Sequence, residues 1–111
     1  MAYGRTGPRR QAFTISDGMP DGMCADVDGN LWIANWGLGR VECRTPVGEL
    51  LATVETGAPH TSSAAFAGPD LDTLVITTST HDLPAPGPGD GRLFTAKVGV
   101  RGLPTPYWNP F

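Results

Sequence analysis

The sequence has few charged residues and no long hydrophobic run, and each absence excludes a class of protein. Only 17% of its 111 residues are charged, the net charge is −3, and no basic run is longer than Arg9-Arg10. A nucleic-acid-binding protein usually carries a basic stripe, so we expect no nucleic-acid partner. No apolar stretch approaches the roughly 20 residues of a membrane-spanning helix, so we expect no membrane partner either. Residues 1–11 have no apolar segment of the kind that a secretory signal requires.

Cysteine and histidine are also scarce. The two cysteines, Cys24 and Cys43, have no second pair at zinc-finger spacing, so they do not predict a zinc site. Each lies in an alternating stretch, which favours a buried free thiol, and a reducing cytoplasm is the expected location. The two histidines, His60 and His81, stand beside turn residues without a metal-binding motif, so we expect both at the surface.

Glycine and proline, in contrast, are abundant. The 15 glycines and 11 prolines show no collagen-like period, so they indicate many turns and short elements, as in an all-β protein. Apolar residues alternate with period two, and Asp28-Gly29 is a strong hairpin signal between two such runs. The sequence predicts four consecutive strands, at Gly22–Val27, Leu31–Asn35, Arg40–Arg44 and Leu50–Val54.

The pattern then repeats. The next predicted strands are Ser62–Phe66, Leu74–Thr78 and Arg92–Val98, with a long surface loop at His81–Asp90, and one further strand is predicted earlier at Gln11–Ile15. Leu74 follows Leu31 by 43 positions, which is within the spacing of about 40–45 residues that is typical of four-stranded propeller blades. We therefore expect an incomplete β-propeller of about two four-stranded blades over residues 11–103. A disordered or extended segment is expected at 1–10, and a Pro-rich tail at 104–111.

Several segments together resemble one known family. They are Pro20–Cys24, Asp26–Ala34, Trp36–Val41, Thr61–Gly68, Asp70–Leu74, Gly91–Phe94 and Val100–Pro104. These segments resemble the C-terminal third of the gluconolactonase, regucalcin and senescence-marker-protein family, in the same order. The resemblance implies a six-bladed propeller with one divalent metal at the top of its central channel. It also implies hydrolysis of sugar lactones or related cyclic esters.

The resemblance makes Asp21 the candidate metal ligand and catalytic residue. In the family the metal is held by a Glu near the N-terminus, an Asn near the middle and the Asp of a Pro-Asp-Gly segment, which here is Asp21. This carboxylate can ligate a divalent cation (Ca, Zn, Mg or Mn) or take a proton from water as a general base. Without the resemblance, Asp21 would be interpreted as a turn residue. The other ligands and the sugar contacts lie in blades outside this sequence, so we expect no micromolar metal binding by the chain alone.

Three other features have a structural interpretation. The segment Asp26–Asn30 is similar to a calcium loop, but the position of the closing Glu is Asn35, so we expect a hairpin turn with solvated acids. Trp32 and Trp36 are expected in the core rather than against a ligand. Ser62 and Ser63 have no base placed beside them in the sequence, so neither is expected to be a nucleophile.

Two functions remain open. The chain is either a portion of a metal-dependent lactone hydrolase, inactive alone, or a non-catalytic propeller remnant or interaction module. In the first case, missing blades supplied by a partner or by other copies would complete the site for a small lactone. In the second, open strand edges would pair with another chain. The mass in solution and lactonase activity distinguish the two.

Overall fold

The described part of the chain is all-β, as predicted. A computed structural model describes residues 5–106 of the chain, and these contain no helix long and apolar enough to cross a membrane. The strands are β1 (Met19–Ala25), β2 (Leu31–Trp36), β3 (Arg40–Arg44), β4 (Leu50–Glu55), β5 (Thr61–Ala67), β6 (Thr73–Thr78) and β7 (Phe94–Lys97). Seven of the eight expected strands are therefore present, most of them within two residues of their expected bounds.

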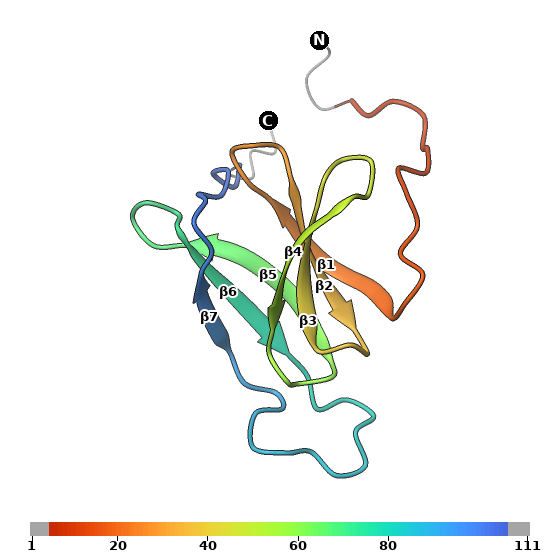
Figure 1. Ribbon diagram of the computed structural model, residues 1–111, viewed down its shortest axis with the longest axis vertical. Coiled ribbons are helices and arrows are strands. Elements are labelled where there is room, and N and C mark those ends of the chain that lie inside the picture. Colours follow the sequence, from red (N-terminus) through yellow and green to blue (C-terminus); the bar gives the residue numbers. More distant parts are fainter. Residues whose placement is uncertain (1–4, 107–111) are drawn as a thin grey trace.

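The strands form two antiparallel meanders that pack face to face (Figure 1). The first sheet has the order β1-β2-β3-β4, and the second has the order β5-β6-β7. The first strands of the two sheets, β1 and β5, contact each other, and β2 also contacts β5. This is the arrangement expected of two neighbouring blades, with the first strand of each on the same side of the molecule.

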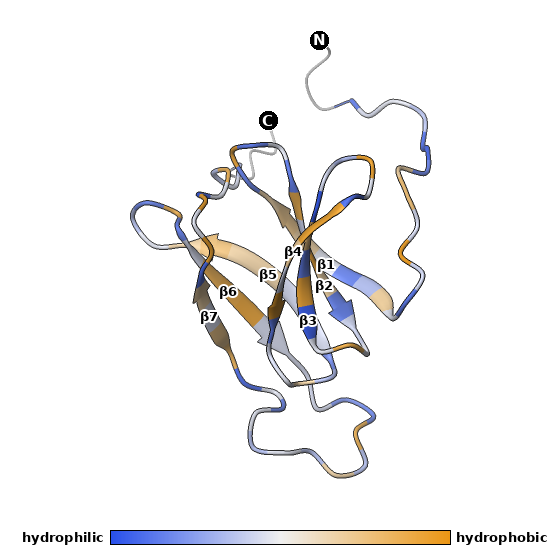
Figure 2. Ribbon diagram, viewed as in Figure 1, coloured by the Kyte–Doolittle hydropathy of each residue, from blue (hydrophilic) through white to orange (hydrophobic). Residues whose placement is uncertain are grey.

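The hydrophobic core lies between the two sheets. Its buried members are Trp32, Val41 and Cys43 from the first sheet and Ala64, Leu74 and Ile76 from the second. In Figure 2 the hydrophobic residues alternate with hydrophilic ones along β3, because only one face of that strand meets the second sheet. Burying a side chain the size of Leu74 contributes about 1.5–3 kcal/mol, so this interface holds the sheets together.

The strand predicted at Gln11–Ile15 is wrong. These residues form no strand, because they have no neighbouring strand with which to complete a ladder. Their chain instead runs beside the first sheet, where Phe13 lies against Gly48 and the Asp17 carbonyl accepts a hydrogen bond from Asn35 Nδ2. Alternation alone cannot reveal whether a partner strand exists.

The long loop predicted between the last two strands is confirmed, and it forms the connection between β6 and β7 below the sheets in Figure 1. The domain bounds at 11–103, and the extended or Pro-rich character of 1–10 and 104–111, remain predictions. Residues 1–4 and 107–111 lie outside the described part of the chain.

The segment after β7 joins the two sheets at the end that carries the β1–β2 turn. The Val27 N–H donates to the Arg101 carbonyl, and the Leu103 N–H donates to the Ala25 carbonyl. Between them, the Gly102 N–H donates to the carbonyl of Leu71, in the turn between β5 and β6, at 2.8 Å. This segment therefore extends the structured unit well past the last strand.

Candidate functional site

Asp21 lies in a pairing irregularity near the start of β1, which is the inner strand of the first sheet because it contacts β5 of the second. Pro20 pairs with Asn35 and Met23 pairs with Ile33, so two residues of β1 stand opposite one residue of β2. Such a β-bulge bends the strand and re-aims the side chains within it. The sequence placed Asp21 in a turn before the strand, but the structure places it inside β1. The Pro-Asp-Gly pattern alone does not show how these residues pair with β2.

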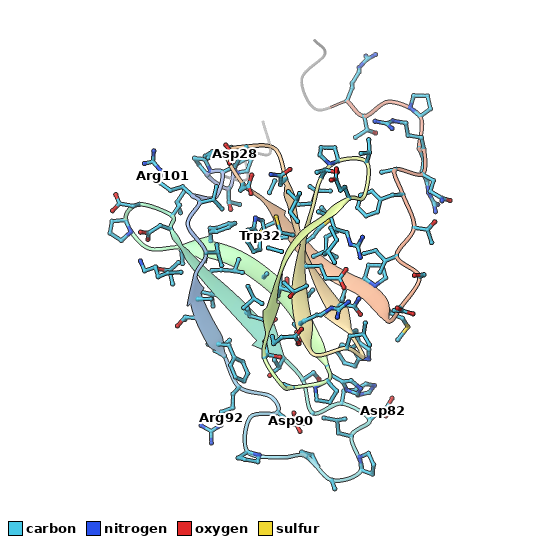
Figure 3. The ribbon with its side chains drawn as sticks, in the orientation of Figure 1. Asp28, Trp32, Asp82, Asp90, Arg92 and Arg101 are labelled. Atoms are coloured by element: carbon cyan, nitrogen blue, oxygen red, sulfur yellow. The ribbon has the colours of Figure 1, made fainter. Side chains whose placement is uncertain are left out.

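The bulge gives Asp21 an open position. The residue is exposed, and it lines a surface cavity of about 330 Å³ together with Met19, Pro20 and Trp36. The β1–β2 turn, with Asp28, is at the opposite end of β1; Asp28 and Trp32 are labelled in Figure 3, which shows Trp32 between the two sheets. The cavity and Asp21 are therefore at the end of the first sheet away from that turn.

Gly22 explains how this part of β1 can approach the second sheet. A Cβ built on Gly22 would lie 2.9 Å from the Cα of Ser63 and closer still to its side chain. Only glycine fits such a close approach of two backbones. Gly22 therefore keeps the inner strands β1 and β5 in contact directly beside Asp21.

The same bulge occurs in the second sheet. Thr61 pairs with Thr78 and Ser63 with Thr77, which leaves Ser62 as the additional residue. Thr78 is 43 positions after Asn35, the repeat length of the sequence, so Ser62 occupies the position of Asp21 in the second sheet. The Ser62 hydroxyl shares a hydrogen bond of 2.8 Å with the Thr77 hydroxyl. The partner of Ser62 is thus another hydroxyl group, and the expectation that Ser62 is no nucleophile remains a prediction.

Trp36 and His60 form an aromatic stack next to Asp21. The ring centroids are 4.1 Å apart and the planes differ by 14°. The two residues also form a β-bridge, and the Gly37 N–H donates to the Pro59 carbonyl at 2.7 Å. Trp32 is a core residue as predicted, whereas Trp36 is half-buried and reaches the Asp21 cavity.

His60 differs from the expectation of a surface histidine. It is half-buried, and its Nδ1 atom is buried without a hydrogen-bond partner in the described structure. His81 is exposed as expected. The position of His60 depends on a contact with a residue 24 positions earlier in the chain, for which the sequence gives no local signal.

The expectation of solvated acids in the β1–β2 turn is wrong for Asp26. This residue is 2% exposed, and its carboxylate accepts hydrogen bonds from the Asp28 and Asn30 N–H groups and from Trp32 Nε1 at 2.8 Å. Three donors satisfy the buried charge, so Asp26 fixes the turn against the core. Asp28 is exposed as expected. Among residues 5–106 no group of three or more His, Cys, Asp or Glu side chains could hold a metal ion.

A second buried carboxylate, Glu42, lies on the face of the first sheet away from the core. Arg40 and Arg44 flank it on the same strand and donate to its two oxygens, each at 2.8 Å, and Asn35 Nδ2 donates at 3.2 Å. Burial alone raises the pKa of Glu42, but the hydrogen bonds from Arg44 and Arg40 outweigh it and hold this pKa below its ordinary value. Because both of its oxygens accept hydrogen bonds from arginines, Glu42 is not available as a free reactive carboxylate.

The two cysteines are free, as expected. Cys43 is buried, and Cys24 is half-buried. Burial raises the pKa of the Cys24 thiol to about 11, with a further contribution from the Asp26 charge. The same two causes raise the pKa of Cys43. Both side chains therefore remain protonated at neutral pH and make poor nucleophiles or metal ligands.

Two stacked antiparallel meanders with matching inner-strand bulges define this chain as a piece of a β-propeller, and comparisons with known proteins agree. Residues 2–80 match the family model described as SMP-30/Gluconolactonase/LRE-like region. The chain belongs to this family. The resemblance inferred from the sequence is therefore confirmed.

Individual relatives cover most of the chain. It is 35% identical to bovine (Bos taurus) regucalcin over 94% of its length, and 37% identical to the pentonolactonase XacC of Haloferax volcanii over 78%. A solved structure named as a calcium-binding protein, regucalcin from Agrobacterium tumefaciens, superposes with a TM-score of 0.85, at 29% identity over 94% of this chain. The chain spans only 37% of bovine regucalcin, 33% of XacC and 37% of the Agrobacterium protein.

Proposed function

We propose that this chain is one portion of a divalent-metal-dependent lactone hydrolase, and that Asp21 is the catalytic and metal-ligating carboxylate it contributes. One observation carries the proposal: Asp21 is an exposed carboxylate in an inner-strand bulge, beside an open cavity. Two further points support it, namely the family membership and a relative named as a pentonolactonase. A carboxylate in this position can take the proton of a water molecule that attacks a lactone carbonyl.

The residues of this chain do not fit a complete metal centre. Calcium takes about 6–8 oxygen ligands and magnesium requires an octahedron, whereas Asp21 supplies one carboxylate. Residues 5–106 place no further cluster of ligating side chains with it. We therefore propose that the chain alone neither binds a divalent cation tightly nor hydrolyses lactones, and that the remaining ligands come from other blades.

A chimaera tests the proposal directly. This chain would replace the aligned third of the Haloferax volcanii pentonolactonase, so that the other blades come from an enzyme whose name states the activity. We expect the chimaera to hydrolyse a pentonolactone in a metal-dependent manner, as measured by acid release at constant pH. Asp21→Asn in the chimaera should reduce the rate by at least about 100-fold, because removing a general base commonly costs 10²–10⁴-fold.

Two controls make the result interpretable. The isolated chain, titrated calorimetrically with calcium, zinc and manganese, should show no micromolar binding. The chimaera with Asp28→Asn, an exposed acid at the other end of β1, should retain its activity. A folded chimaera without activity, or one that tolerates Asp21→Asn, would refute the proposed function.

A second candidate, a non-catalytic interaction module, rests on the second sheet. That sheet has three strands rather than four, and within residues 5–106 no strand pairs with the outer edge of β7. An open edge presents unpaired backbone groups that can receive a strand from another chain. This candidate predicts self-association or partner binding through β7 without lactonase activity in the chimaera. Light scattering of the isolated chain, with and without Thr95→Pro in β7, measures the contribution of that edge.

A further inference from the structure

We propose that Trp36, backed by His60, is a stacking platform for the ring of a carbohydrate-derived ligand, immediately beside Asp21. The substrate class in this inference rests on the proposed function, but the platform itself rests on the geometry. Trp36 is half-buried, stacks on His60, and lines the same cavity as Asp21.

The platform is held rigidly. His60 covers one side of the Trp36 indole at a centroid distance of 4.1 Å, and the backbones of the two residues form a β-bridge. Main-chain bonds fix both ends of this pair, because Pro59 accepts from Gly37 and His60 accepts from Ser79 at 2.9 Å. A side chain already fixed before binding loses little conformational entropy when a ligand stacks on it.

The chemistry of the cavity selects the ligand. An indole face binds the C–H face of a saturated ring, and the adjacent Asp21 carboxylate accepts hydrogen bonds from hydroxyl groups. Met19 and Pro20 supply the remaining apolar wall. A quaternary ammonium ion is the other ligand that suits an indole and a carboxylate, but such cations are held by cages of several aromatic rings, and this cavity offers one. A polyhydroxylated ring therefore fits best.

The test measures binding without metal and without hydrolysis. The full chain, labelled with ¹⁵N and kept in a chelator, would be titrated with methyl β-D-glucopyranoside up to about 100 mM, a range that detects weak single-ring contacts. We expect the indole N–H signal of Trp36, assigned through Trp36→Phe, to shift saturably. The Trp32 indole signal should remain in place, because its N–H is bonded to Asp26.

Matched ligands and variants sharpen the result. Acyclic D-sorbitol at the same concentration should move the Trp36 signal at least about fivefold less, because it presents no ring face. The saturation-transfer signal of the bound sugar should stay within about threefold of its native intensity in Trp36→Phe and should disappear in Trp36→Ala. His60→Ala should weaken binding about threefold or more, whereas Asp28→Asn should leave it unchanged. Dispersed amide spectra verify that each variant is folded.

Several outcomes would overturn the platform. They are a Trp36 signal that does not respond to the sugar, a response to tetramethylammonium alone, or sugar binding that survives Trp36→Ala. The chimaera experiment separates this inference from the proposed function. If the chain binds the sugar ring but the chimaera has no lactonase activity, the platform is supported and the hydrolase proposal is refuted. If the chimaera is an Asp21-dependent lactonase but the Trp36 signal does not respond to the sugar, the hydrolase proposal is supported and the platform is refuted.

Discussion

The two sheets share one backbone plan but differ in the side chains placed on it. Both inner strands carry a bulge at the same position, yet the additional residue is the exposed Asp21 in one and the hydroxyl-bonded Ser62 in the other. The third strands differ in the same way. Glu42 stands opposite Ile33, as Phe94 stands opposite Ile76, but Phe94 packs against the core while Glu42 lies in a charged network. The repeat therefore determines the backbone geometry that both sheets share, and the side chains that differ between the sheets determine their local chemistry.

The largest expected effect comes from inserting a side chain between β1 and β5, where the two backbones are in close contact. Gly22→Val places a side chain where the Ser63 backbone already lies, so we expect a loss of about 3 kcal/mol in the free energy of unfolding, measured in urea. Gly7→Val, at a glycine with open space around it, is the matched control. An unchanged urea midpoint for Gly22→Val would mean that β1 and β5 do not touch at this point.

The second effect compares the first turns of the two sheets. Asp26→Ala leaves two backbone N–H groups and the Trp32 indole without their acceptor, so we expect a loss of about 2–3 kcal/mol, measured by thermal unfolding. Asp72, in the corresponding turn of the second sheet, is a more exposed residue paired with Lys97. Asp72→Ala should change the stability far less, and equal losses in the two variants would contradict the structural role of Asp26.

The third effect concerns Glu42 and acid. Glu42→Gln removes the charge that faces two arginines, and we expect a loss of about 1–2 kcal/mol at pH 7. Because the folded-state pKa of Glu42 is below its ordinary value of 4.5, the charged form stabilises the fold above that value. The stabilisation disappears as the pH falls through the lower, folded-state pKa. Urea midpoints of the two proteins should therefore converge in acid, and a constant difference between them would argue against the network.

The smallest effect is on thiol reactivity and leaves the fold intact. With the pKa of Cys24 raised to about 11, the thiolate at pH 7.5 is about 100-fold scarcer than for a free cysteine. Ellman's reagent should therefore react with the native chain much more slowly than with the urea-unfolded chain. Equal rates would show that Cys24 and Cys43 are not shielded.

Much of this fold could be predicted from the sequence, because alternation and turn residues act locally. The runs that became β2, β3 and β6 were each found within one or two residues of their bounds. The strand at Gln11–Ile15 failed because a ladder also needs a partner. Asp26 was misjudged because its burial depends on an indole that reaches back across the turn, and neither the bulge at Asp21 nor the stacking of Trp36 on His60 is a local property. The metal-ligand role of Asp21 rests on family resemblance and remains a prediction.

The segment after β7 has a consequence for how the chain folds. Arg101 and Leu103 complete hydrogen bonds with residues about 75 positions earlier, and Gly102 packs so tightly that a Cβ there would overlap the Phe66 side chain. Contacts of such long sequence separation slow folding, because the intervening chain must be ordered first. On the ribosome, the two sheets can dock fully only after this last segment has left the exit tunnel. Until then, a nascent chain leaves more of the apolar surface between the two sheets open to solvent.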